Sequence, residues 1–564
     1  MARISFKFKS LRSEDANPRT LTLRACLSVD LDWLGSDRLQ TKVLTILCLF
    51  LVVLTFLVSF GTALRLKMHS EVPIWVVSAV PPALSRVAYG HERSYMSLNF
   101  VHDSFFQQVK GNDAKSINGA IANILAATPV ATDKSDRILS GDDKGIVVVT
   151  EMAFRLFGYK VQGVLYIYYI ILALSAALFA YSFRANPYAL LLLAAFLLLH
   201  SMILPMIKYN GQLTSILALR CMPVLAMIAC MHCLMFLFEP EANRKALIAV
   251  VLQVAIIVFV IHIRSTAMWE LALVIGGSLV ALVLRKGPVA APLSGARARF
   301  ALWPTAVPLI SAAIFVLALN AHRAYGFPEE YHRGGEIVTR PFWHNIFSGF
   351  AYHPNFAKRY DLRVDDFTTI LATKQFLLAH GRDKDWDATG GNTPGYTGMR
   401  WKAYDAAAKE LLVARCTEYF GECLATFAYY KPVSMFKNLL WLTGLRKLPP
   451  DMDIFVSRFP EIGVVVKQQF TEMSRQLDIH KERGRLWFRG LLAMAIAFGI
   501  LAVVRRRRNE AMPVAVTAAV LAAGATAPSL VGYPAPHTIA EAAIAIPLLL
   551  VVLAAFLRAR PQKG

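Results

Sequence analysis

Charged residues are scarce in this chain. Asp, Glu, Lys and Arg make up 17% of its 564 residues, against about a quarter in an average soluble domain. Hydrophobic residues make up 56%, and the mean hydropathy is +0.46. This balance excludes an ordinary cytosolic enzyme.

The familiar nucleotide and hydrolase signatures are also missing. The sequence contains no P-loop, no G-x-S-x-G elbow, no zinc signature and no Gly-rich nucleotide loop. Cytoplasmic chemistry driven by ATP therefore has no support. We predict no cofactor, and a divalent metal remains an open alternative.

Cysteine is rare, and seven residues are too few for a disulfide scaffold. Cys230 and Cys233 form a C-x-x-C pattern inside an apolar run, where buried filler is the expected role. Cys416 and Cys423 lie in a hydrophilic stretch. An unbroken helix would hold their Cα atoms about 10 Å apart, too far for a disulfide. Gly421 is the expected break point, so the pairing stays open.

What the chain has instead is ten apolar runs of about the length that crosses a bilayer. They predict an all-α polytopic membrane protein of about ten transmembrane helices. The expected spans are 43–65, 161–183, 188–206, 219–238, 246–262, 268–284, 301–320, 487–504, 512–530 and 537–557. The first is a retained anchor rather than a signal peptide.

Basic residues are distributed unequally between the short connections, which sets the orientation. Fourteen lie on the side that also holds the C-terminal tail, and three lie on the other. We therefore place both termini in the cytoplasm of a bacterium, with the chain in its inner membrane. The net charge of +22 then indicates contact with membrane lipids and not with nucleic acid, because no basic stretch is interleaved with aromatic residues.

This orientation divides the chain into four parts. Residues 1–42 form a cytoplasmic segment, and residues 43–320 form a membrane module that includes a first external loop at 66–160. Residues 321–486 form a mostly helical external subdomain, and residues 487–564 supply the last helices and a basic tail. Any chemistry is expected in the two external segments.

The first external loop ends with two adjacent carboxylates, Asp142 and Asp143, just before an apolar helix expected to begin near Gly145. One interpretation is a helix cap, because carboxylates are favoured at a helix N-terminus. A second is a general base, since a carboxylate at the membrane surface can accept a proton from a sugar hydroxyl. We favour Asp143, with Asp142 close behind.

This pattern resembles the GT-C superfamily of integral membrane glycosyltransferases. The resemblance rests on a long external loop after the first span, on its Asp142–Asp143 pair, and on AFRLFG at 153–158 ahead of the second span. A second large external segment after the seventh span agrees with it. Lys144, directly after the carboxylates, is atypical and leaves open which of the two would be the base.

The resemblance implies transfer of a sugar from a polyprenyl-phosphate-linked donor to a glycan, lipid or protein acceptor, with inversion at the anomeric carbon. Such a donor needs cations at the outer surface. The candidates for phosphate binding are Arg264, His262, Arg220 and Lys208. The alternative for each basic side chain is snorkelling to lipid head groups.

Candidate sugar and acceptor contacts combine aromatic faces with polar groups. They are His102, Asp103, Trp343, His344, Tyr352, His353 and His537. The same composition suits an interfacial packing surface, and a histidine such as His102 is commonly a plain surface residue.

Two other functions compete with a glycosyltransferase. An oligosaccharide polymerase or ligase also uses external loops and arginines, but it lacks an early acidic loop. A transporter or assembly protein would carry charges at mid-membrane in broken helices, and the centres of these spans are free of charge.

Overall fold

The computed structural model describes residues 37–64, 83–84, 86–87, 114–127, 145–160, 162–207, 222–239, 243–286, 296–325, 332–333, 336–337, 342–364, 366–390, 400–442, 479–505, 508–534 and 539–558. These residues are almost entirely helical. A single two-stranded antiparallel pair, β1 (His332–Arg333) with β2 (Glu336–Ile337), is the exception within those ranges. The predicted all-α class is confirmed.

All ten expected spans correspond to apolar helices of the structure. Six are long enough to cross a bilayer and four are shorter. The helices are α1 (Asp37–Leu64), α6 (Gln162–Ser182), α7 (Pro187–Ile207), α8 (Pro223–Phe236), α9 (Arg244–Ile263), α10 (Met268–Lys286), α11 (Ala296–Tyr325), α21 (Ile479–Arg505), α22 (Arg508–Val531) and α23 (Ala540–Arg558). The chain is a multi-pass membrane protein.

Helix α8 lies at the centre of the bundle, and every one of its residues is buried. A helix that is apolar all round is stable only when neighbours cover it on every side; α6, α9, α10 and α22 pack against it. Cys230 and Cys233 are fully buried there as free thiols.

A buried polar network joins α1, α6 and α7. The His200 ring contacts the Ser59 hydroxyl at 2.8 Å through Nδ1 and the Tyr168 hydroxyl at 2.7 Å through Nε2. The Tyr169 hydroxyl donates to the Ser59 carbonyl at 2.9 Å. Because buried polar groups are stable only when they are hydrogen-bonded, this network fixes how the first helix packs on the bundle.

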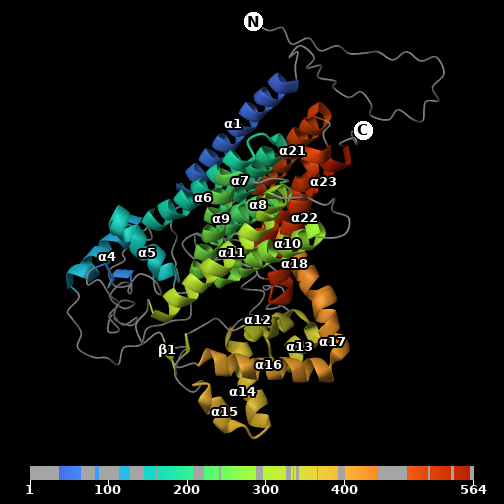
Figure 1. Cartoon of the computed structure of the whole chain (residues 1–564). Helices are drawn as coiled ribbons and strands as arrows, with labels where there is room; N and C mark the ends of the chain where they lie inside the picture. The colour runs from blue at the N-terminus through green and yellow to red at the C-terminus, as the bar shows by residue number, and fades with distance from the viewer. Residues whose placement is uncertain are drawn as a thin grey trace, which may run out of the picture.

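Two short helices of the first external loop are described. They are α4 (Ala114–Ala127) and α5 (Gly145–Phe157). Helix α5 begins at Gly145, as the sequence predicts, and packs on α6 and α9. Figure 1 shows both helices on the same side of the bundle.

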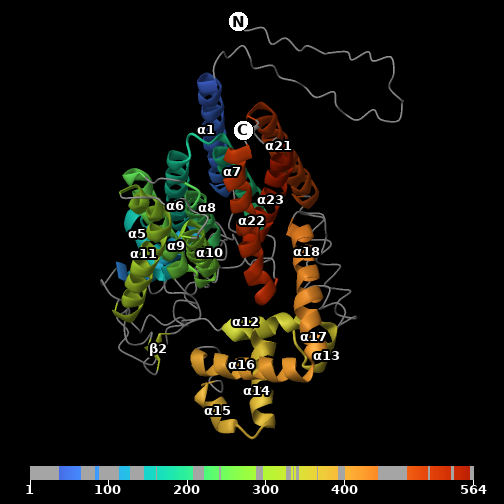
Figure 2. The same cartoon turned by 45° about the vertical axis from the view of Figure 1, so that its right-hand side comes forward.

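The external subdomain has its own core, which includes Phe347, Phe350, Phe356, Trp386 and Tyr404. It begins with β1 and β2, and its helical segments are α12 (Phe342–Ser348), η5 (Gly349–Tyr352), α13 (Pro354–Arg359), α14 (Asp366–Ala379), α15 (Asp383–Ala388), α16 (Trp401–Glu418), α17 (Phe420–Ala425), the π-helical turn η7 (Thr426–Tyr430) and α18 (Lys431–Leu442). In Figures 1 and 2 this subdomain lies at one end of the bundle, while α1 begins and α23 ends at the opposite end.

Cys416 and Cys423 form a disulfide with a Cα–Cα distance of 5.3 Å. The helix breaks between them, as the pairing requires, but at Tyr419 (φ −124°, ψ 54°) and not at Gly421. Helix α16 ends before that residue and α17 begins after it. The question that the sequence left open is answered in favour of the bridge.

Candidate functional site

The start of α5 touches the end of α9. A Cβ atom on Gly145 would lie 2.6 Å from the backbone nitrogen of Ile263 and closer still to the His262 carbonyl group. Only glycine allows such an approach, because real Cβ atoms stay beyond about 3 Å from other heavy atoms. The start of α5 and the end of α9 therefore meet at one point of the structure.

The α9–α10 turn is tight, as expected. Arg264 leaves the helix with extended backbone angles (φ −148°, ψ 106°), while its N–H still donates to the Val260 carbonyl at 2.7 Å. The 3₁₀ turn η3 (Ser265–Ala267) leads directly into α10. This geometry holds Arg264 at the junction of two spanning helices.

Arg264 is buried, with 6% of its surface exposed. A charge in such a place is stable only with a charged or strongly polar partner. Glu541, on the first turn of α23, interacts electrostatically with Arg264 and also makes a side-chain hydrogen bond with Trp269. The snorkelling alternative does not fit this residue, since its head group lies inside the protein.

A second group of basic side chains lies on the α11 side of the same helix end. The His262 and His322 rings are 5.2 Å apart, and Arg323 donates a hydrogen bond to the Ile261 carbonyl at 3.4 Å. His262 is 4% exposed. Arg264 and Arg323 are therefore two cations that lie near this end of α9.

Arg86 extends this positive region from the first external loop. Its guanidinium lies 2.6 Å from a Glu151 carboxylate oxygen, and Arg155 lies 2.9 Å from the other oxygen. Partial burial opposes ionisation of Glu151, but the hydrogen bonds from the two arginines outweigh it and lower the pKa of that carboxyl. Glu151 therefore holds Arg86 against α5 without cancelling the positive charge of the region.

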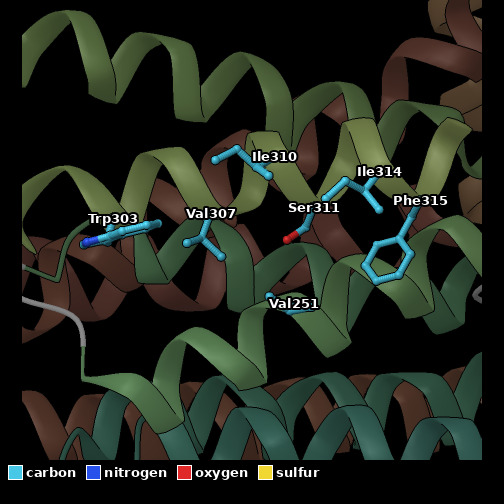
Figure 3. A pocket seen from close by; sticks show the side chains of 7 residues that line it. All are labelled: Val251, Trp303, Val307, Ile310, Ser311, Ile314 and Phe315. Carbon is cyan, nitrogen blue, oxygen red and sulfur yellow. The ribbon is translucent and has the colours of Figure 1, made fainter.

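Helices α9 and α11 line an apolar cavity of about 380 Å³. Figure 3 shows the side chains around it, one from α9 and six from α11. They are Val251, Trp303, Val307, Ile310, Ser311, Ile314 and Phe315. Phe315 precedes Arg323 by eight residues, or about 12 Å along a helix. The cavity therefore lies about two helical turns from the end of α11 that carries Arg323.

Of the residues that the sequence assigned to the site, several lie outside the described ranges. They are Asp142, Asp143, Arg220, Lys208, His102, Asp103 and His537. Within the described ranges, no group of three or more His, Cys, Asp or Glu side chains is placed to hold a metal ion.

Besides Arg264 and His262, four assigned residues are described, and all four belong to the subdomain. His344, Tyr352 and His353 are buried there, and Trp343 is half-buried. The His344 ring contacts the Tyr404 hydroxyl at 2.6 Å and Asp366 at 3.1 Å, while His353 accepts a hydrogen bond from the Asn355 N–H at 3.2 Å. These contacts stabilise the subdomain, and a role in acceptor binding stays a prediction.

Comparison with known proteins adds little. No family model and no curated protein matches the chain. It is similar to the crystal structure of ArnT from Cupriavidus metallidurans bound to undecaprenyl phosphate, with 14% identity over 90% of this chain and 76% of the other. The TM-score is 0.28, too low to establish a common fold.

Proposed function

We propose that this chain is a membrane glycosyltransferase of the GT-C type. It transfers a sugar from a polyprenyl-phosphate-linked donor to a glycan, lipid or protein acceptor of a bacterial envelope, on the external face of the inner membrane. The observation that carries the proposal is the contact between Gly145 and the His262–Ile263 backbone. It joins the acidic loop end to the basic end of α9.

Asp142 and Asp143 lie outside the described residues. In the sequence they stand three and two positions before Gly145, the residue that contacts the end of α9. This supports Asp143, or its neighbour, as the general base.

The positive outer end of α9 suits the phosphate of the donor. Phosphate is a good leaving group, and cations that neutralise its growing charge lower the barrier for transfer. Arg264 has the planar fork that grips two phosphate oxygens, and Arg323 and His262 add positive or hydrogen-bonding groups nearby. Attack by the acceptor hydroxyl opposite this leaving group would invert the anomeric carbon.

The apolar cavity between α9 and α11 supports a lipid-linked donor (Figure 3). Ile310 and Ile314 are 51% and 57% exposed, so the cavity opens toward the place where lipid chains lie. A polyprenyl chain whose phosphate is held at the end of α9 reaches it along the same two helices. Burial of apolar chain surface then contributes about 25 cal/mol per Å² to donor binding.

The proposed placement puts both termini in the cytoplasm and the external subdomain in the periplasm. The Cys416–Cys423 disulfide is in keeping with an oxidising compartment. The subdomain then covers the acceptor side of the site, where Trp343, His344, Tyr352, His353 and the loop residues His102, Asp103 and His537 remain our candidates for sugar contacts.

The test is turnover by the purified full-length chain in lipid vesicles. A panel of synthetic polyprenyl-phosphate monosaccharides is added with envelope glycan and lipid extracts, and released polyprenyl phosphate is measured by mass spectrometry. We expect turnover by the wild type and a loss of about 10²–10⁴-fold in Asp143→Asn or Asp142→Asn. Asp383→Asn, an exposed carboxylate of the subdomain, is the matched control. Near-normal turnover in both loop variants would contradict a catalytic role for the acidic pair and leave only its role as a helix cap.

A further inference from the structure

Helix α18, the last described helix of the subdomain, has its polar side chains inside and its apolar side chains outside. Lys431, Ser434 and Asn438 follow one another at helical spacing and are at most 8% exposed. On the opposite face Phe436 is 59% exposed, and Val433 is half-buried. A helix on the surface of a water-soluble domain has the reverse arrangement. The inverted pattern indicates that the outer face of α18 has an apolar surrounding.

The polar face of α18 docks on the membrane bundle through hydrogen bonds. The Lys431 Nζ donates to the Val531 carbonyl at 2.8 Å, and the Asn438 side chain donates to the Pro534 carbonyl. Val531 is the last residue of α22, and Pro534 follows it closely. Polar side chains at membrane depth have this arrangement, because they face the protein and pair with backbone carbonyls. The apolar face of α18 is thereby left on the outside.

The position of α18 brings this outer face to the lipid-facing surface of the bundle. The helix packs against the spanning helices α22 and α7, and in Figures 1 and 2 it extends from the subdomain toward the bundle. The side chain of Val531, whose carbonyl Lys431 contacts, is 41% exposed. An exposed apolar side chain of a spanning helix therefore lies next to α18. With 12 residues, α18 is about 18 Å long, which suits one leaflet and not the whole bilayer core.

Two further side chains fit the level of the lipid head groups. Tyr429, just before α18, is 60% exposed, and tyrosine is enriched at membrane interfaces. Lys437 is the one exposed charge of α18. Side chains on a helix tilt toward its N-terminus, and the N-terminus of α18 points away from the bundle. The lysine stem can therefore lie along the apolar face while its ammonium reaches the head groups.

We propose that the outer face of α18, formed by Val433 and Phe436, lies among lipid acyl chains in the leaflet on the side of the subdomain. The subdomain is then anchored in the membrane by a helix that enters one leaflet. Two other occupants would be residues 443–478 of this chain or a second copy of it. Residues 443–478 are rich in charged side chains, which suit an apolar face poorly. The inference does not depend on the proposed enzyme activity.

The experiment measures which quencher reaches a fluorescent bimane probe on the full-length chain in phosphatidylcholine nanodiscs. The probe is attached to single cysteines in the variants Phe436→Cys and Val433→Cys. One quencher is the same lipid with brominated acyl chains, and the other is aqueous iodide. The background lacks the five cysteines outside the disulfide, which are Cys26, Cys48, Cys221, Cys230 and Cys233.

Two exposed apolar positions serve as matched controls. Ile496→Cys, at a side chain of α21 that is 53% exposed, marks the lipid-facing surface of a spanning helix. Phe367→Cys, at a side chain of α14 that is 63% exposed, marks the water-facing surface of the subdomain. Figures 1 and 2 show α14 on the side of the subdomain away from the bundle. The two controls thus bracket the result at α18.

We expect the probes at positions 436 and 433 to lose emission in brominated nanodiscs as the probe at position 496 does. Iodide should quench only the probe at position 367. In addition, Phe436→Asp should lower the thermal unfolding midpoint in nanodiscs, because a charge among acyl chains is costly. Phe367→Asp should leave that midpoint unchanged. If Phe436→Cys does not fold, the result at position 433 decides.

Two results would overturn the inference. Quenching of the α18 probes by iodide and not by brominated lipid would show that this face lies in water. Protection of these probes from both quenchers would show that protein covers the face, either residues 443–478 or a second copy of the chain.

Discussion

Gly145 lies directly against the backbone of His262, with no room for a side chain between them. The two residues are separated by more than a hundred positions, which include α6, α7, α8 and nearly all of α9. Their contact holds the start of α5 against the end of α9 that leads to Arg264. The local geometry of the proposed active site depends on it.

Replacement of Gly145 by alanine tests this contact. The added methyl group meets backbone atoms of His262 and Ile263, which cannot rotate away, so α5 must shift. We expect Gly145→Ala to lower the thermal unfolding midpoint and to reduce turnover at least tenfold, since a displacement of about 1 Å at a reacting group is enough for larger losses.

Gly276→Ala is the matched control, because this glycine lies inside α10 with open space around its Cα. There the exchange should be neutral or stabilising by up to about 1 kcal/mol, the helix propensity difference. If both variants behave alike, the contact between α5 and α9 is not tight in solution.

Substitution of Arg264 tests whether this residue binds the donor phosphate or only takes part in a structural ion pair. Lysine keeps the charge but has no planar fork. We expect Arg264→Lys to raise the donor KM about tenfold or more, since hydrogen bonds to charged groups contribute about 1.5–3 kcal/mol each. Acceptor KM should stay nearly constant, and Arg264→Ala should be more severe. The control is Arg184→Lys, at an exposed arginine near the opposite end of the bundle. Equal donor KM values for Arg264→Lys and wild type would contradict a phosphate site at Arg264 and favour one at Arg323 or Arg220.

Lys431 gives the joint between the subdomain and the bundle a pH dependence. Its ammonium is fully buried, lies 4.2 Å from the Phe427 ring centre and donates to the Val531 carbonyl at 2.8 Å. Burial lowers the pKa of Lys431 from 10.5 to about 7. Below pH 7 the folded and unfolded chains both hold the proton, and the folded chain bears the full cost of the buried charge.

Between pH 7 and 10.5 the unfolded chain still binds this proton while the folded chain releases it, so stability rises with pH. We expect the free energy of unfolding of the wild type to rise, relative to that of Lys431→Met, by up to about 1.4 kcal/mol per pH unit in this range. Thermal unfolding in detergent at several pH values measures the difference. Lys358→Met, at an exposed lysine of the same subdomain, should show no such trend, and a pH-independent gap for Lys431→Met would contradict the assignment.

The orientation of the chain in the membrane can be tested by labelling with an impermeant thiol reagent. In spheroplasts, a cysteine at exposed Lys384 of the subdomain should react from outside, and one at exposed Lys245 at the start of α9 should not. The background is a variant in which Cys26, Cys48, Cys221, Cys230 and Cys233 are replaced, so that only Cys416 and Cys423 of the disulfide remain. If only the cysteine introduced at position 245 reacted, the subdomain and the proposed site would lie in the cytoplasm.

The sequence predicted the membrane architecture well because that architecture follows from local composition. A run of about 20 apolar residues has few alternatives to a spanning helix, and each of the ten expected runs is a helix. The start of α5 at Gly145 and the tight turn at Arg264 were also readable from short patterns of residues.

The partners across the bundle were not predictable in this way. Nothing near Arg86 indicates that it pairs with Glu151, and nothing near Lys431 indicates that it reaches Val531. Such contacts depend on how helices pack, and packing has no signal within a single segment. Glu541 carried one weak signal, a carboxylate in the first turn of a spanning helix, but its link to Arg264 appears only in the structure.

The most direct measurement is a structure of the full-length chain in nanodiscs with a polyprenyl monophosphate. We expect the phosphate group within hydrogen-bond distance of the Arg264 guanidinium, at the contact of Gly145 with His262, and the first isoprene units directed toward the cavity between α9 and α11. A phosphate bound away from the outer end of α9, with Arg264 engaged only with Glu541, would contradict the proposed donor site.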